Sequence, residues 1–223
     1  SRPTPPLPFP HQENLYLQDV QNDPDKIGQL LSDSIFEAHQ RTCLLSREQI
    51  QVGWSQGINE YKVDQFRKMP SEDLWICAAQ RLTNVIQQII EFAKMVPGFM
   101  QFPQEDQIVL LKAGSFELAV LRMSRYFDMS NNHVLFVGDH TQLLEKSFML
   151  PMEAFTTTGN TEEMTLVSQI FDTAKAIADL KLSEVALSLY SAYVLLQADR
   201  PGLKNLEEIR KLNDAVCNSL QRE

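Results

Sequence analysis

Two consecutive segments of this chain are too apolar to lie on a protein surface, and a Pro-Gly pair separates them. Residues 71–96 carry two neighbouring apolar stripes at helical spacing, and residues 105–123 are apolar on nearly every side of a helix. Pro97 lacks a backbone donor and Gly98 favours the conformation that often follows a helix, so the first helix is expected to end there. We expect the first helix to lie between layers and the second at the centre of an α-helical domain.

The rest of the chain predicts more helices and one small β-element. Ser71, followed by two acidic residues, is expected to cap the first long helix, and Ser183 is expected to cap a later one that ends before Arg200. A short strand is expected at residues 133–138, where β-branched and aromatic residues precede a glycine. Further helices are predicted over residues 25–45, 160–180 and 203–220, and a loop or short helix over 52–68. The pattern is all-α with one hairpin.

The domain organisation follows from the proline content. Residues 1–24 begin with a proline-rich stretch that cannot hold a regular hydrogen-bond ladder, and we interpret them as a linker or extension. Residues 25–223 are long enough and apolar enough to form one domain.

Composition excludes several functions. The net charge of −9 disfavours direct contact of this domain with nucleic acid. Three cysteines without CxxC spacing and four scattered histidines indicate no disulfide framework, no metal site and a reducing compartment. No apolar run reaches the roughly 18 residues of a membrane span, so we expect no membrane contact. Catalytic and nucleotide-binding motifs are absent from the sequence, so we expect no enzyme and no cofactor.

Two lysines lie at the edges of the long apolar segments. Lys94 falls in the last turn of the first helix, and Lys112 lies one turn beyond Ile108 on the second. If the helices pack side by side, Ile90, Ile108 and Leu111 form an apolar floor with a lysine at either rim. Alternatively, Lys94 only complements the dipole of its own helix, and the aliphatic residues are ordinary core.

A longer motif changes the weight of these alternatives. The letters read FAKxxPGF from Phe92 and DQxxLLKxG from Asp106, and this run resembles the signature of nuclear receptor ligand-binding domains. The resemblance extends from Ile27 to the end of the chain. The additional motifs EFAK, LRMxRYF, VxFxG, IFD and RPGL are most similar to the retinoid-related orphan receptor group, especially insect hormone receptor 3. The resemblance implies a three-layer antiparallel helical sandwich with one small β-hairpin.

The resemblance also implies docking of LxxLL coactivator helices and of corepressors. The matching docking residues are Ile90, Lys94, Gln107, Ile108, Leu111 and Lys112. In the family, a glutamate on a short terminal helix forms the opposite clamp of this site. No segment of this sequence matches that helix, so the ligand-gated half of the switch stays unassigned.

A lipophilic pocket beneath the hairpin is implied as well, for a sterol-like ligand or filled by its own side chains. Its wall would comprise Leu45, Ala79, Leu82, Arg122, Met123, Arg125, Val134, Leu135, Phe136, Val167, Ile170 and Phe171. Arg122 and Arg125 would reach the polar end of the ligand; pairing with carboxylates and the helix end is the alternative. Glu117 and Arg200 match a buried ion pair of the family.

The function that the resemblance implies is that of a ligand-binding and coregulator-docking domain of a nuclear transcription factor. A soluble lipid carrier would use the same cavity but would not need the lysine-rimmed groove. A third alternative is a domain that has no ligand and acts by pairing with another receptor through its last long helix. A nuclear location follows from the first reading.

Overall fold

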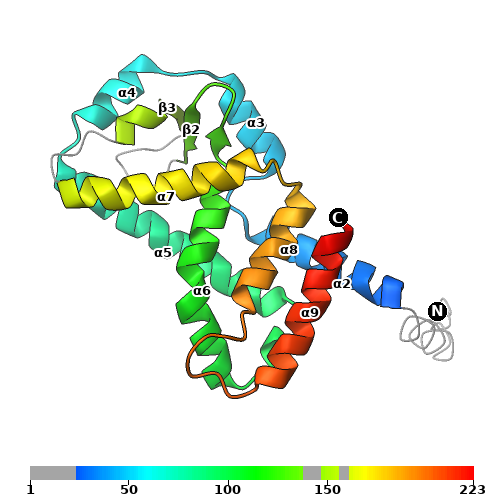
Figure 1. Cartoon of the computed structure of the whole chain (residues 1–223). Helices are drawn as coiled ribbons and strands as arrows, with labels where there is room; N and C mark the ends of the chain where they lie inside the picture. Colours follow the sequence, from blue (N-terminus) through cyan, green and yellow to red (C-terminus); the bar gives the residue numbers. More distant parts are fainter. Residues whose placement is uncertain (1–23, 138–146, 156–160) are drawn as a thin grey trace, which may run out of the picture.

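The computed structural model of this chain describes residues 24–137, 147–155 and 161–223, in which helices from distant parts of the sequence pack around α6 (Figure 1). The helices are α2 (Pro24–Thr42), α3 (Arg47–Ser55), α4 (Glu60–Arg67), α5 (Ser71–Met95), α6 (Gln104–Ser124), α7 (Thr161–Asp179), α8 (Glu184–Leu195) and α9 (Leu206–Arg222). Two short 3₁₀ helices are η1 (Phe99–Gln101) and η2 (Met152–Phe155), and three strands are β1 (Phe127–Asp128), β2 (His133–Phe136) and β3 (Phe148–Pro151). The all-α prediction is confirmed. The predicted linker, residues 1–24, lies outside the described residues except for Pro24.

The Pro-Gly break between the two long helices is confirmed. α5 ends at Met95, and Gly98 adopts the left-handed conformation, with φ of 87°, that starts η1. A Cβ at Gly98 would lie 3.2 Å from Leu212 Cδ2 of α9, so the turn also packs tightly against a helix distant in sequence. The expected serine cap of α5 is wrong: Pro70 holds the cap position, and Ser71 is the first helical residue. The cap predicted at Ser183 is confirmed, because its hydroxyl accepts a hydrogen bond from Ala186 N at 3.0 Å.

The principal core lies where α2, α5, α6 and α8 meet. α6 packs against α5, α7 and α8, and α2 packs against α5, α8 and α9. Phe92 of α5, Leu110 and Leu118 of α6, and Leu195 of α8 are fully buried there. α8 also packs against α9, so α8 connects the central α6 with α9 (Figure 1).

Only the second half of α5 lies between layers, which corrects the expectation for this helix. Ile89 and Phe92 are fully buried, but Trp75 is 38% and Ile76 49% exposed. The apolar pattern that predicts burial of the whole helix therefore predicts its second half correctly and its first half wrongly.

The β-element is a three-stranded antiparallel sheet in the order β1-β2-β3, one strand more than the predicted hairpin. Phe127 pairs with Val134 between β1 and β2, and Val134 pairs with Leu150 between β2 and β3. β1 has only two residues, which is too short for a pattern of alternation to reveal in the sequence. The sheet covers a second apolar cluster that α4, α6 and α7 complete.

Two absences apply to the described residues only. Within residues 24–137, 147–155 and 161–223, no helix combines the length and apolarity needed to cross a bilayer. The same ranges contain no group of three metal-ligating side chains close enough to hold an ion.

Candidate functional site

The face shared by α5 and α6 carries apolar side chains between two exposed lysines. Lys94 lies in the last turn of α5 and Lys112 on α6, and both side chains are exposed. Between them Ile108 is 43% exposed, while Ile90 and Leu111 are half-buried. α5 and α6 pack directly against each other, and we use the name α5–α6 groove for the six predicted docking residues on them, Ile90, Lys94, Gln107, Ile108, Leu111 and Lys112. Its aliphatic residues are not sealed in the core.

The polar residues of the α5–α6 groove are held by weak or local contacts. Lys94 Nζ lies 2.7 Å from Glu91 Oε1, and both side chains are about half exposed. Such a surface pair contributes no more than about 1 kcal/mol, so Lys94 is available to another acceptor at little cost. Gln107 Nε2 donates to the carbonyl of Phe102 at 2.8 Å, which ties the start of α6 to the turn that precedes it.

The predicted pocket residues do not line one common cavity. Arg122, Arg125, Val134 and Leu135 are buried, and Leu45 is half-buried against Leu135. Met123, Val134, Phe136, Ile170 and Phe171 belong to the second apolar cluster. Val167 is half-buried on α7. Ala79 and Leu82 lie instead on the exposed half of α5.

Aromatic rings occupy the centre of the predicted pocket. Phe155 of η2 stacks on Phe171 of α7, with 4.6 Å between ring centroids. Phe66 of α4 packs edge-on against both Phe136 and Phe155, at 5.4 Å and 5.2 Å. The guanidinium carbon of Arg81 lies 3.6 Å from the centroid of Phe136. Side chains thus fill much of the space under the sheet.

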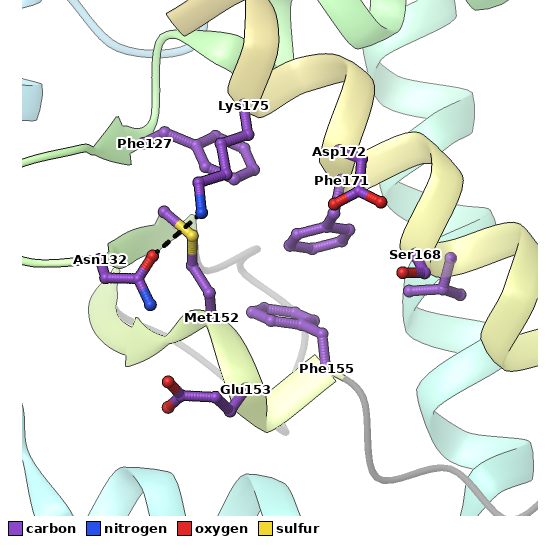
Figure 2. Close-up of a pocket in the computed structure, with 10 residues that line it drawn as sticks. Phe127, Asn132, Met152, Glu153, Phe155, Ser168, Phe171, Asp172 and Lys175 are labelled. Carbon is purple, nitrogen blue, oxygen red and sulfur yellow. Dashed lines mark hydrogen bonds between the residues drawn. The ribbon is translucent and has the colours of Figure 1, made fainter. Parts of the chain in front are cut away.

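A small cavity remains beside these rings (Figure 2). Its volume is about 160 Å³, and Val167 and Phe171 are the two predicted pocket residues that line it. Figure 2 shows the rings of Phe155 and Phe171 facing each other, with Lys175 Nζ and Asn132 Oδ1 joined by a 3.3 Å hydrogen bond. Pockets for drug-sized ligands measure roughly 300–1,000 Å³, so this cavity is too small for a sterol.

Both arginines of the predicted pocket are bound by protein groups. Arg122 Nη1 and Nη2 donate to the carbonyl and the hydroxyl of Thr42, at 2.5 Å and 2.8 Å. Arg125 Nε and Nη2 contact the carboxylate of Glu184, at 3.1 Å and 2.9 Å. His39 Nε2 lies 3.2 Å from the same carboxylate. For Arg125 the geometry favours carboxylate pairing, the alternative that the sequence leaves open.

Burial and charge pairing set the protonation states in this polar cluster. Burial alone would raise the pKa of Glu184, but hydrogen bonds from His39 and Arg125 lower that pKa to about 2. Burial disfavours a charged His39, yet contacts with Cys43 and Glu184 outweigh it and raise the His39 pKa above 6.5. Burial would also raise the pKa of Cys43, but His39 lowers it, and the sulfur lies 3.6 Å from His39 Nε2.

The cluster joins α2, α6 and α8, and no sequence motif predicts it. His39 lies in the last turn of α2 and Cys43 directly follows that helix, a spacing of four residues that predicts contact between them but no further partner. Glu184 has the ordinary appearance of an acid in the first turn of a helix. Only the tertiary structure brings it to Arg125.

Glu117 and Arg200 form a bidentate ion pair at the edge of α6. Arg200 Nη1 and Nη2 donate to Glu117 Oε1 and Oε2, at 3.0 Å and 2.5 Å. The side chain of Arg200 is 19% exposed and that of Glu117 is 47% exposed, so the pair is partly solvated, whereas the resemblance implies a buried pair.

The chain matches a family model described as "Ligand-binding domain of nuclear hormone receptor" over residues 60–222. It is 49% identical over 172 residues to the probable nuclear hormone receptor HR3 of Drosophila melanogaster, covering 72% of this chain and 33% of that protein. It is 37% identical over 191 residues to nuclear receptor ROR-alpha B of Danio rerio and 33% identical over 192 residues to nuclear receptor ROR-beta of Homo sapiens. Those two matches each cover 86% of this chain and 38% of the relative. The chain thus spans about a third of the length of the curated relatives that it matches.

Proposed function

This chain belongs to the ligand-binding domains of nuclear hormone receptors, and from that premise we propose that the α5–α6 groove docks an LxxLL helix of a coactivator. The predicted resemblance to the orphan receptor group and the non-enzymatic assignment are confirmed by the same matches. The single observation that supports the docking proposal is the exposed Ile108 between two exposed lysines on adjoining helices.

Burial of apolar side chains and the dipole of the docked helix both favour a helical partner. Each leucine of an LxxLL helix inserted against Ile90, Ile108 and Leu111 contributes roughly 1.5–3 kcal/mol of gross burial. Lys94 faces the C-terminal carbonyls of the docked helix and adds about 0.3–1 kcal/mol. Association costs offset most of this sum, which leaves a Kd on the order of micromolar. Lys94 therefore orients the partner more than it holds it.

Fluorescence anisotropy with a labelled LxxLL peptide tests the docking proposal. The combined variant Lys94→Ala and Ile108→Arg removes the dipole contact and places a charge in the apolar floor, so we expect at least about tenfold weaker binding. The matched control combines Lys211→Ala on α9 and Val52→Arg on α3, which are also an exposed lysine and an exposed aliphatic residue. It should bind like the parent. Equal binding by both variants would favour a soluble lipid carrier.

For the ligand, we propose that the aromatic cluster fills most of the family's pocket region, so that the domain holds its shape without a sterol-like molecule. The stacked Phe155 and Phe171 and the small cavity beside them support this alternative. Native mass spectrometry of freshly purified protein, followed by lipid extraction, should give the mass of the unliganded chain. A stoichiometric sterol-sized adduct would contradict it.

We propose a nuclear location and a role in transcription for the whole protein, with DNA contact made by a module outside this chain. The net charge of −9 supports a domain that does not itself touch phosphates. Corepressors would use the same groove as coactivators. Pairing with another receptor through α9 is the alternative, and a mixture with candidate receptor domains would then show the summed mass.

A further inference from the structure

A second cleft, of about 300 Å³, lies where the C-terminal ends of α6 and α7 meet α3 and the start of α8. It shares only Arg125 with the predicted ligand residues and none of the residues that we assign to the α5–α6 groove. Phe127 is the one described residue that lines both this cleft and the cavity of Figure 2. The cleft is therefore a separate site.

The lining of the cleft is positive in a protein that is strongly negative. Arg47, Arg125 and Lys181 contribute three cations, and Asp128 is the acidic residue among the described residues that line it. Asp128 is already used within its turn, where its oxygens accept from Ser130 N at 3.1 Å and Asn131 Nδ2 at 2.7 Å. The surplus of cations favours a ligand with negative charge.

Two of these three cations have no carboxylate partner among the described residues. Arg125 is 5% exposed, and its Nε and Nη2 contact Glu184, so its charge is already paired. Arg47 and Lys181 form no ion pair with any carboxylate of the part of the chain that the structure describes. A ligand carboxylate is an acceptor that both a guanidinium and an ammonium can bind.

The remaining wall of the cleft is apolar and rigid. Ile177 of α7 and Leu187 of α8 line it together with Trp54 of α3. Trp54 is fixed at both ends, because its Nε1 donates to the carbonyl of Tyr126 at 3.2 Å and Arg47 lies over its ring at 4.9 Å. A ligand here would place an alkyl or aromatic part against this wall and its charged end against Arg47 and Lys181.

We propose that this cleft binds a small amphipathic carboxylate. A volume of about 300 Å³ lies at the small end of the roughly 300–1,000 Å³ range of small-molecule pockets, which favours a medium-chain carboxylate over a larger lipid. This site is independent of coregulator docking, because the two surfaces have no residue in common.

Isothermal titration calorimetry at low ionic strength tests the charge preference with octanoate, octanamide and octylammonium. These three molecules have the same chain and differ in the charge of the head group. Octanoate should bind with one-to-one stoichiometry, at least about tenfold tighter than octanamide, and octylammonium should bind more weakly than either. Added salt should reduce the preference for octanoate. Octanoate that binds no tighter than octanamide would overturn the proposal.

Two variants locate the site. Arg47→Gln combined with Lys181→Gln should weaken octanoate binding about tenfold and leave octanamide binding unchanged. The control Lys175→Gln removes the lysine of the cavity in Figure 2 and should change neither. If Lys175→Gln abolishes the preference instead, the carboxylate binds in that cavity and the proposal is wrong. Lys181 is exposed, so Lys181→Gln alone keeps the test valid if the double variant does not fold.

The two tryptophans supply a readout that does not depend on any variant. Trp54 lines the cleft, whereas Trp75 lies on the outer face of α5. In a ¹H–¹⁵N spectrum, octanoate should shift the indole N–H signal of Trp54 and leave that of Trp75 in place, with Trp75→Phe providing the assignment. A shift of Trp75 alone would overturn the proposal.

Discussion

Arg125, which ends α6, and Glu184, which starts α8, are 59 residues apart in sequence and form a buried ion pair with Nη2 and Oε2 2.9 Å apart. His39 of α2 contacts the same carboxylate from a third helix. Replacing a charge in such a cluster leaves the others desolvated without a partner. The polar cluster therefore holds three helices in register, and this role is distinct from ligand recognition.

Stability should depend on pH through this cluster. The folded-state pKa of Glu184 is about 2 against an ordinary 4.5, so its contribution is complete above pH 4.5 and is lost as pH falls toward 2. The pKa of His39 is raised above 6.5, so its contribution is complete below pH 6.5 and is lost as pH rises through the raised value. Urea denaturation across the pH range should place the largest contribution of the cluster between pH 4.5 and 6.5. A contribution that increases steadily above pH 7 would contradict the assignment.

Glu184→Gln should lower the free energy of unfolding by about 3 kcal/mol at neutral pH, because it leaves Arg125 buried beside a neutral group. Parent and variant should converge in stability as pH falls toward 2. The control Glu37→Gln breaks an exposed pair with Arg41 and should cost no more than about 0.5 kcal/mol. Equal losses of unfolding free energy from the two variants, measured by urea denaturation, would show that Glu184 does not stabilise the contact of the three helices.

Gly98→Ala should destabilise the domain more than Gly57→Ala. Both glycines have positive φ, 87° and 69°, so each alanine incurs backbone strain of about 1–2 kcal/mol. A Cβ at Gly98 would also meet Leu212 at 3.2 Å, whereas nothing lies within 4 Å of one at Gly57. The difference between the two variants in thermal denaturation measures the tight packing of the α5–α6 turn on α9. Equal destabilisation by the two variants would mean that the Leu212 side chain moves away from the new Cβ at little cost.

Phe155→Ala should enlarge the cavity of Figure 2 and lower the free energy of unfolding by about 2 kcal/mol, because Phe155 packs on Phe66 and Phe171. The new space should also let the variant retain a lipophilic molecule that the parent does not, which native mass spectrometry detects. Phe116→Ala, at a ring that is 51% exposed, is the matched control and should cost under about 1 kcal/mol. A Phe155→Ala protein as stable and as free of ligand as the parent would show that the cluster does not fill the pocket.

The sequence predicts well what depends on local pattern. The helices around the Pro-Gly break and the serine cap at Ser183 follow from spacing and turn chemistry. The exposure of the aliphatic residues between Lys94 and Lys112 is favoured by the family resemblance, because spacing alone is also compatible with an ordinary core. Asp106 shows the limit of that approach. It belongs to the DQ motif of the family, and the structure shows its oxygens accepting from the backbone of Lys204 and Asn205 at 2.8 Å and 2.9 Å, which anchors the start of α9.

The predicted pocket depends on tertiary contacts that the sequence does not show. The family resemblance implies Ala79 and Leu82 as wall residues, but neither it nor apolar periodicity reveals which half of α5 other helices cover. Arg122 and Arg125 stand three residues apart, and their partners, Thr42 and Glu184, come from segments distant in sequence. Neither partner can be identified without the tertiary structure. The filling of the pocket by Phe155 depends on η2, a single turn of helix that no periodicity predicts.

A ¹H–¹⁵N titration of the chain with an LxxLL peptide tests docking in the α5–α6 groove most directly. We expect saturable shifts concentrated at Ile90, Lys94, Ile108 and Leu111, loss of those shifts with Ile108→Arg, and little change on α3 or α9. Shifts centred on another face, or none at peptide concentrations well above micromolar, would contradict docking in the α5–α6 groove.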